Sequence, residues 1–312
     1  MSVPVSVSEM SDPRHPPQPG HGDGDEAELC FNGAVRTVGE LIEAGARRLP
    51  HRDSLPDPRR EARWLLARAA GVSEGWLLLH GDAVPPEETA ARFDEWLERR
   101  AAGEPAHHLT GRCSFWGREF AVSPAVLVPR PETEFVVAVA LELPLPATAR
   151  VLDVGTGSGC LGVTLAAERP GWSVRAVDRS LPALEVARHN AGRHGVSLAL
   201  ACGRLGACLF GGYELVVANL PYIPSGRLAS LPLEVRHDPA LALDGGADGL
   251  DLVRSLLDDL PRLLSPCGGA ILELGEDQAD EVARLAGRGA LAVARRVRDL
   301  GGCERVVVLE RR

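Results

Sequence analysis

The sequence contains no lysine, so all 34 of its basic side chains are arginine, and aromatic residues make up only 4% of its 312 residues. No apolar run approaches the ~20 residues that span a bilayer, so we expect neither a membrane-spanning protein nor a membrane partner. The first residues lack the basic-then-apolar pattern of a secretory signal, which predicts a cytoplasmic protein. We attribute the missing lysine to codon usage in a G+C-rich genome and give single arginines little functional weight.

The cysteines also lack the spacings that bind metals. No C-x-x-C or Cys/His pattern occurs, so we predict reduced thiols, no disulfide framework and no metal site. The formal net charge of −9 argues against phosphate contacts over a basic face, so we expect no direct DNA binding. The seven cysteines are Cys30, Cys113, Cys160, Cys202, Cys208, Cys267 and Cys303.

The length and composition indicate a globular chain of about two domains, since 45% of the residues are hydrophobic and 25% are charged. Residues 1–30 have too few apolar side chains to offset the entropy of ordering, and we expect a disordered tail there. We predict a helical domain over residues 31–103, a β-hairpin linker over 104–145 and an α/β domain over 146–312. The helical periodicity rests on three apolar faces: Val38, Leu41, Ile42 and Leu49 around Gly45; Ala62, Leu65, Leu66 and Ala69; and Phe93, Trp96 and Leu97.

Strand and helix patterns alternate in the C-terminal part of the chain. This alternation predicts a mainly parallel, doubly wound sheet of seven strands with helices on both faces. The linker contains β-like runs at residues 115–116, 120–122 and 126–128, which predict a hairpin. The expected sheet strands lie at residues 150–153, 174–177, 198–201, 215–218, 270–274, 291–293 and 306–309.

A glycine-rich turn follows the first of these strands. Its glycines let the backbone turn tightly and approach a ligand without a Cβ in the way. The dinucleotide pattern G-x-G-x-x-G would need glycine at position 160, which is Cys160. The G-x-G-x-G form after an acidic residue suits S-adenosylmethionine, which has no pyrophosphate. The candidate cofactor-binding residues are Gly155, Thr156, Gly157, Ser158 and Gly159.

Asp178 ends the next predicted strand. A carboxylate at this position can accept hydrogen bonds from both ribose hydroxyls of a nucleoside, which makes Asp178 a further cofactor-binding candidate. Alone, it could equally cap the helix that begins near Leu181. Together with the glycine turn, ribose binding is the better interpretation.

The strand over residues 215–218 ends in Asn219-Leu220-Pro221-Tyr222, at the sheet edge where α/β proteins bind ligands. The Asn219 side-chain oxygen and the Leu220 carbonyl can each accept one hydrogen from a planar –NH₂ group, and Tyr222 can stack on that group. A sulfonium donor already carries its leaving group, so the protein has to supply position rather than a strong base or a metal. We take all four residues as catalytic and substrate-binding candidates, with Asn219 also near the cofactor.

These motifs together resemble the class I, Rossmann-like S-adenosylmethionine-dependent methyltransferases that modify planar nitrogens. Further stretches make the chain similar to the release-factor glutamine methyltransferases, the PrmC or HemK family, from about residue 34 to residue 312. The stretches that carry this resemblance are Gly103-Glu104-Pro105, Leu109-Thr110-Gly111, Phe115-Trp116, Pro129-Arg130-Pro131-Glu132-Thr133-Glu134, Glu234-Val235-Arg236-His237-Asp238-Pro239, Gly246-Ala247-Asp248-Gly249-Leu250, Leu272-Glu273-Leu274-Gly275, Arg298-Asp299-Leu300-Gly301 and Glu304-Arg305-Val306.

The resemblance implies N5-methylation of the glutamine in the Gly-Gly-Gln loop of peptide chain release factors, which the helical domain would dock. It implies that residues 155–159 hold the methionine part of the donor, Asp178 its ribose, and residues 219–222 the glutamine. We expect Arg130 and Glu132 to lock the linker onto the sheet edge.

Two positions depart from the family pattern. Leu220 stands where the family has proline, which loses turn stiffness but keeps the backbone carbonyl. Arg204 follows Gly203 where the family has aspartate. Because arginine cannot accept a hydrogen bond, adenine has to be recognised by backbone atoms or by stacking.

Three other functions stay open at this stage. Adenine carries the same –NH₂ geometry, so DNA adenine methylation is one alternative, although the net charge and the missing target-recognition domain argue against it. Methylation of a ribosomal-protein glutamine is the second. A non-catalytic partner-binding module with a vestigial cofactor site is the third.

Overall fold

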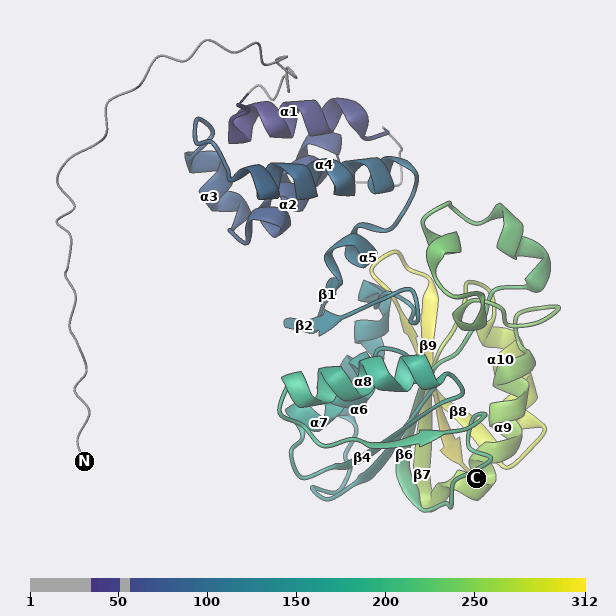
Figure 1. The fold of residues 1–312 in the computed structure, drawn as a ribbon. Coiled ribbons are helices and arrows are strands. Elements are labelled where there is room, and N and C mark those ends of the chain that lie inside the picture. Colours follow the sequence, from purple (N-terminus) through teal and green to yellow (C-terminus); the bar gives the residue numbers. More distant parts are fainter. Residues whose placement is uncertain (1–34, 51–56) are drawn as a thin grey trace, which may run out of the picture. The chain divides into compact units, whose positions relative to one another are not determined.

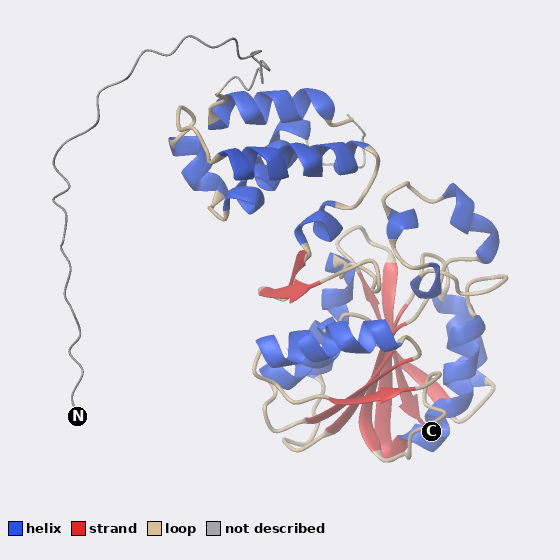
Figure 2. Ribbon diagram, viewed as in Figure 1, coloured by secondary structure: helices blue, strands red, loops and turns tan. Residues whose placement is uncertain are grey.

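The computed structural model describes residues 35–50 and 57–312. The expected tail over residues 1–30, with Cys30, lies outside these ranges. Figures 1 and 2 show the described helices and strands. The helices are α1 (Val38–Arg48), α2 (Pro58–Ala70), α3 (Glu74–Leu79), α4 (Glu87–Ala101), α5 (Ala106–Thr110), α6 (Glu134–Glu142), α7 (Cys160–Glu168), α8 (Leu181–Arg193), α9 (Asp251–Leu263) and α10 (Ala279–Gly287), with 3-10 turns η1 (Pro131–Thr133), η2 (Ser225–Ser230), η3 (Val235–His237) and η4 (Ala240–Ala242).

Local sequence signals set the limits of the N-terminal helices. Thr37 and Glu40 form a capping box that starts α1. Asp57 caps the start of α2 at Pro58, and Gly71, in the left-handed conformation, caps its end after Ala70. The apolar faces predicted from periodicity are confirmed: their side chains are buried in one cluster, with Trp96 half-buried against it.

Gly45 lies where α1 packs closely against both α2 and α4. A Cβ there would lie 2.9 Å from Phe93 Cζ and 3.1 Å from Ala62 Cβ. We expect Gly45→Val to lower the free energy of unfolding by about 1–3 kcal/mol through overpacking. Gly75→Ala in α3 is the matched control, because its Cβ would meet only Ser73 Oγ, at 3.9 Å; it should raise stability by about 0.5–1 kcal/mol. Urea unfolding measures both, and equal effects would contradict the packing argument.

Seven strands form one sheet in the order β5-β4-β3-β6-β7-β9-β8. The first five are parallel, β9 is antiparallel to β7, and β8 is antiparallel to β9. The predicted seven-stranded, mostly parallel sheet is therefore confirmed. Its strands are β3 (Arg150–Val154), β4 (Ser173–Asp178), β5 (Ala199–Cys202), β6 (Tyr213–Asn219), β7 (Leu264–Glu273), β8 (Leu291–Arg298) and β9 (Glu304–Arg311).

Helices cover both faces of the sheet. Successive side chains of a strand point to opposite faces, so each strand contributes to both clusters. Leu152 and Val216 point into the cluster that contains α9 and α10. Val151 and Leu215 point into the opposite cluster with α6 and α7. Figure 1 shows α6, α7 and α8 on one side of the sheet and α9 and α10 on the other. The strand order reverses between β3 and β6, and their carboxyl ends form the switch point where such folds bind ligands.

For three segments, the strand bounds predicted from the sequence differ from those in the structure. β8 continues to Arg298, although we expected it to end at residue 293. It is an edge strand that pairs with β9, and its exposed arginines do not show the apolar pattern by which a strand is predicted. β7 begins at Leu264, before the expected residue 270. In the linker, β1 (Arg112–Phe115) and β2 (Arg118–Ala121) form the predicted hairpin, but residues 126–128 form no strand. Val126 and Val128 are instead buried in a loop against Cys113 and Val122.

Within the described residues, no helix is both long and apolar enough to cross a membrane.

Candidate active site

The glycine-rich loop leaves the carboxyl end of β3 and enters α7. Gly155, Gly157 and Gly159 have φ angles of 74°, 54° and 81°, a region that favours glycine. Gly159 caps α7, and a Cβ there would lie 3.1 Å from Ala187 Cβ in α8. Its evident role is helix packing, whereas residues 155–158 line a cavity of about 260 Å³.

Asp153, in β3, hydrogen-bonds this loop and the first turn of α7. Its Oδ2 accepts hydrogen bonds from Thr156 Oγ1 at 2.6 Å and from the Gly162 amide at 3.0 Å. Its Oδ1 has no hydrogen-bond partner among the described residues. Burial, opposed by these two hydrogen bonds and reinforced by Asp178, raises the pKa of Asp153 from 3.8 to about 6.

The raised pKa makes stability depend on pH. Between about pH 4 and 6 the folded protein holds a proton on Asp153 that the unfolded chain releases, so the free energy of unfolding falls as pH rises. We expect Asp153→Asn to remove this dependence. The change that the substitution makes to the free energy of unfolding should be about 2–3 kcal/mol more favourable at pH 8 than at pH 4. Urea unfolding at both pH values checks this, with exposed Asp82→Asn as the control; identical effects at the two pH values would contradict it.

Asp178 lies at the end of β4 and reaches the same loop. Its Oδ2 accepts a hydrogen bond from the Gly157 amide at 2.9 Å, and its Oδ1 accepts one from the Ser180 amide at 2.8 Å. The residue that caps α8 is Ser180, whose side chain accepts from the Ala183 amide. Asp178 therefore faces the glycine loop and lines the cavity with Gly203 and Arg204, the departure expected at the adenine position. Its contact with a ribose stays a prediction.

The Asn219-Leu220-Pro221-Tyr222 turn lies against the glycine loop. A Cβ on Gly155 would lie 3.0 Å from Leu220 Cδ2 and 3.7 Å from the Asn219 carbonyl oxygen. Asn219, Leu220 and Pro221 line the same cavity as the loop. The strands β3 and β6 are neighbours, which brings the two motifs together at the switch point.

A second cavity, of about 310 Å³, adjoins the first. The two share Leu127, Arg130, Asn219, Leu220 and Ala242 in their walls. Tyr222 lines only the second, where burial above all raises the pKa of its phenol and keeps it neutral. Asn219 therefore stands at the junction of a glycine-lined cavity and a cavity with an aromatic wall.

The linker contributes a partner to Asn219 in a way that the sequence did not indicate. Asn219 Nδ2 donates a hydrogen bond to Thr133 Oγ1 at 3.0 Å, across 86 residues of chain. Thr133 lines the first cavity, whereas Glu273, which is paired with Asn219 in the sheet register, is 3% exposed and lines the second. A signal for Glu273 was present, since it is a charged residue that ends a buried apolar strand. Thr133 carried no such signal.

Arg130 does not lock the linker onto the sheet edge as we expected. It pairs at 2.6 Å with Asp238, a fully buried carboxylate in the segment between β6 and α9. Glu132, the other residue given this role, lines the second cavity with Glu273 and Arg305. The physical reason is that a long loop segment follows β6. This segment lines the site and supplies Asp238 as the partner of Arg130, which the sheet edge does not.

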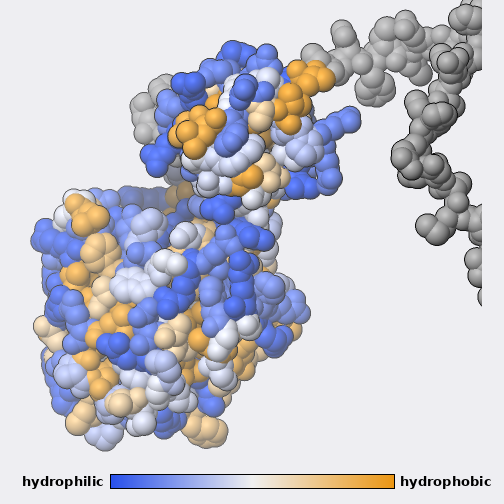
Figure 3. All heavy atoms as spheres, turned by 90° about the vertical axis from the view of Figure 1, so that its left-hand side faces the viewer, coloured by the Kyte–Doolittle hydropathy of each residue, from blue (hydrophilic) through white to orange (hydrophobic). Residues whose placement is uncertain are grey.

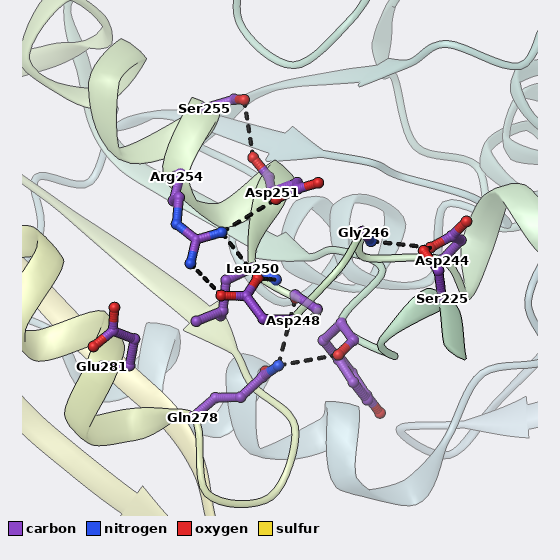
Figure 4. Close-up of polar contacts among 12 residues, drawn as sticks. Ser225, Asp244, Gly246, Asp248, Leu250, Asp251, Arg254, Ser255, Gln278 and Glu281 are labelled. Carbon is purple, nitrogen blue, oxygen red and sulfur yellow. Dashed lines mark hydrogen bonds and ion pairs between the residues drawn. The ribbon is translucent and has the colours of Figure 1, made fainter. Parts of the chain in front are cut away.

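Gln278 holds the other end of the polar turn (Figure 4). Its Nε2 donates to the Tyr222 carbonyl at 3.0 Å and to the Gly249 carbonyl at 3.4 Å, and its Oε1 accepts from the Gly275 amide at 2.9 Å. Next to Gly249, Asp248 pairs with Arg254 of α9, and this ion pair fixes the loop before α9. The backbone at Tyr222 is thus tied to two loops that follow β6 and β7.

A doubly wound parallel sheet with a glycine loop and a polar turn at its switch point defines a class I S-adenosylmethionine-dependent methyltransferase. The chain is 39% identical to the release factor glutamine methyltransferase of Rhodospirillum rubrum over 294 residues, 93% of this chain and 90% of that protein. It is 42% identical to the Bradyrhizobium diazoefficiens protein of the same name, over 86% of this chain and 95% of that one. The chain belongs to the release factor glutamine methyltransferase family.

Two domain families match separate parts of the chain. Residues 40–111 match the PrmC N-terminal domain, and residues 135–230 match the methyltransferase small domain. Among solved structures, a 16S rRNA N2 G1207 methyltransferase of T. thermophilus in complex with AdoMet and guanosine is 18% identical, with a TM-score of 0.47. That match covers 64% of this chain and 50% of the other.

Proposed function

We propose that this protein transfers a methyl group from S-adenosylmethionine to the side-chain amide nitrogen of the glutamine in the Gly-Gly-Gln motif of peptide chain release factors. The observation that carries the proposal is the position of Asn219 between two adjoining cavities, against the glycine loop. The first cavity would take the donor, and the second, with Tyr222 in its wall, would take the flat amide. Close relatives that bear this activity in their names support the same substrate.

The residues of the first cavity fit the donor. Gly155 and Gly157 present backbone without a Cβ, and Asp178 keeps carboxylate lone pairs for ribose hydroxyls beside its two backbone contacts. Gly203 and Arg204 line the expected adenine end, where backbone atoms or stacking would make the contact. When bound, S-adenosylmethionine supplies a methyl group on a positively charged sulfur.

The chain's own contribution is position. Asn219 Oδ1 and the Leu220 carbonyl accept the two amide hydrogens of the glutamine, which aims its nitrogen along the line to the methyl carbon. The nitrogen–carbon bond forms as the carbon–sulfur bond breaks, the sulfur keeps the electron pair, and the nitrogen then loses one proton to solvent. Tyr222 excludes water from the amide face.

The helical region would dock the release factor. Four of its large apolar side chains are exposed, with Leu78 and Leu79 exposed by 66% and 82% and Trp76 and Val84 less so. Figure 3 shows hydrophobic side chains at the surface of this region among hydrophilic ones. Leu78 and Leu79 end α3 and are adjacent in sequence, and a contiguous exposed apolar patch typically marks contact with another protein.

The decisive experiment incubates the protein with isotope-labelled donor and a purified release factor, followed by mass spectrometry of the Gly-Gly-Gln peptide. Label on the glutamine amide is the expected result. Parallel reactions with ribosomal proteins and with duplex DNA test the other acceptors that present an –NH₂ group. Label on either of these but not on the peptide would overturn the proposal, and absence of donor binding by calorimetry would indicate a vestigial site.

A further inference from the structure

Asn219 has to present a particular atom to the substrate. A side-chain amide offers an oxygen that accepts and an –NH₂ group that donates, and a half-turn about one bond exchanges them. A substrate –NH₂ needs the oxygen. The orientation of Asn219 therefore decides whether the site can accept hydrogens from its substrate at all.

Two side chains lie beside the Asn219 amide, Thr133 in the wall of the first cavity and Glu273 in the wall of the second. Thr133 Oγ1, in η1 of the linker, accepts a hydrogen bond from Asn219 Nδ2 at 3.0 Å. Glu273 is the neighbour of Asn219 across β6 and β7, and its carboxyl lies close enough to the side chains of Thr133 and Asn219 for both to favour its charged form. Glu273 is 3% exposed, and its Oε2 has no hydrogen-bond partner within residues 35–50 and 57–312.

The charge of the carboxylate favours the direction of the bond between Thr133 and Asn219. An ionised carboxylate only accepts, so it attracts the single hydroxyl hydrogen of Thr133 to its own side. The Thr133 oxygen then has only lone pairs to offer and has to accept from Asn219 Nδ2. The charge of Glu273 likewise favours the –NH₂ group of Asn219, rather than its oxygen, on this side. The –NH₂ group is thereby held by Thr133 and Glu273, which leaves Oδ1 for the substrate.

We propose that Thr133 and Glu273 are positioning residues that lock the Asn219 amide with its oxygen toward the acceptor cavity. This inference rests on the proposed function and deepens it, because the lock makes the site selective for acceptors that carry an –NH₂ group. A protonated Glu273 would donate to Thr133, whose hydroxyl could then donate to Asn219 Oδ1 and turn the amide over. Methyl transfer is therefore expected to need the ionised form.

The charge state of Glu273 is set by groups on every side of it. Burial raises its pKa to about 7, against hydrogen bonding from Thr133 that lowers it. Glu132 raises the pKa further and Arg305 lowers it. The phenol of Tyr222 and the thiol of Cys160 also face Glu273, and burial raises the pKa of each, so both stay neutral near pH 7. Glu273 is therefore expected to gain or lose its proton within the pH range of an ordinary activity assay.

The test compares kcat for release-factor methylation from pH 6 to 9 at saturating donor. In the wild-type protein kcat should rise through about pH 7, as Glu273 loses its proton. Glu273→Gln can present either its oxygen or its –NH₂ group, so kcat should fall about tenfold and lose the rise. Thr133→Val should lower kcat about 10- to 100-fold, and Thr133→Ser should restore it to within about threefold of wild type.

Thr164→Val is the matched control, because Thr164 is fully buried in α7 and its hydroxyl has no hydrogen-bond partner among the described residues. It should leave kcat unchanged. Donor affinity, measured by calorimetry, should stay within about threefold in the Glu273 and Thr164 variants and within about tenfold in the variants of Thr133, which lines the first cavity; retained donor binding separates the lock from misfolding. A wild-type pH profile in Glu273→Gln, or wild-type kcat in Thr133→Val, would overturn the inference. An inactive wild-type protein would instead contradict the proposed function.

Discussion

Replacement of Asn219 by alanine should abolish methyl transfer, with kcat reduced at least about 10³-fold, while donor affinity stays within about tenfold. The substitution removes the side-chain oxygen that would accept one hydrogen of the acceptor amide. A positioned polar group of this kind contributes about 10²- to 10³-fold to catalysis, and the loss of in-line geometry adds to this. Steady-state kinetics with a release factor and calorimetry with the donor measure the two quantities separately.

The contrast between the two quantities is the informative part of that experiment. Asn219 lines both cavities but hydrogen-bonds only Thr133 in the described structure, so its removal leaves the glycine loop and Asp178 intact. Wild-type turnover in Asn219→Ala would discard the mechanism. Loss of donor binding together with activity would place the residue in the donor site alone.

Asp178→Ala should weaken donor binding at least about 100-fold. Hydrogen bonds to a charged group contribute about 1.5–3 kcal/mol each, and the carboxylate would accept two from the ribose. The substitution also removes the acceptor of the Gly157 amide and so loosens the loop that frames the cavity. Calorimetric titration with S-adenosylmethionine gives the dissociation constant directly.

Asp244→Ala is a suitable control for that measurement. Asp244 also accepts hydrogen bonds in a loop, from Ser225 Oγ at 2.6 Å and the Gly246 amide at 2.9 Å, but it lines neither cavity (Figure 4). Its removal should leave donor affinity unchanged. A dissociation constant within about threefold of wild type for Asp178→Ala would show that the ribose is bound elsewhere.

Much of the fold follows from patterns that span a few residues. The apolar runs at β3, β4 and β6 are buried on both faces, and such continuous runs are typical of parallel strands. The edge strand β8 has no such pattern, because its exposed side chains are mostly arginine, and it was placed only in part. Pairing with β9 through backbone hydrogen bonds defines this strand, and backbone pairing leaves little trace in side-chain composition.

The sequence by itself determined the sheet, the glycine loop and the polar turn at Asn219, because each depends on neighbours along the chain. Only the tertiary structure decided what surrounds them. Thr133 reaches Asn219 across 86 residues, and Arg130 reaches Asp238 across 108. Hydrogen bonds between such distant residues arise from how the elements pack, so no local period or spacing encodes them. Burial has the same origin: the pKa of Glu273 is raised to about 7 because packing has removed water from its carboxyl group.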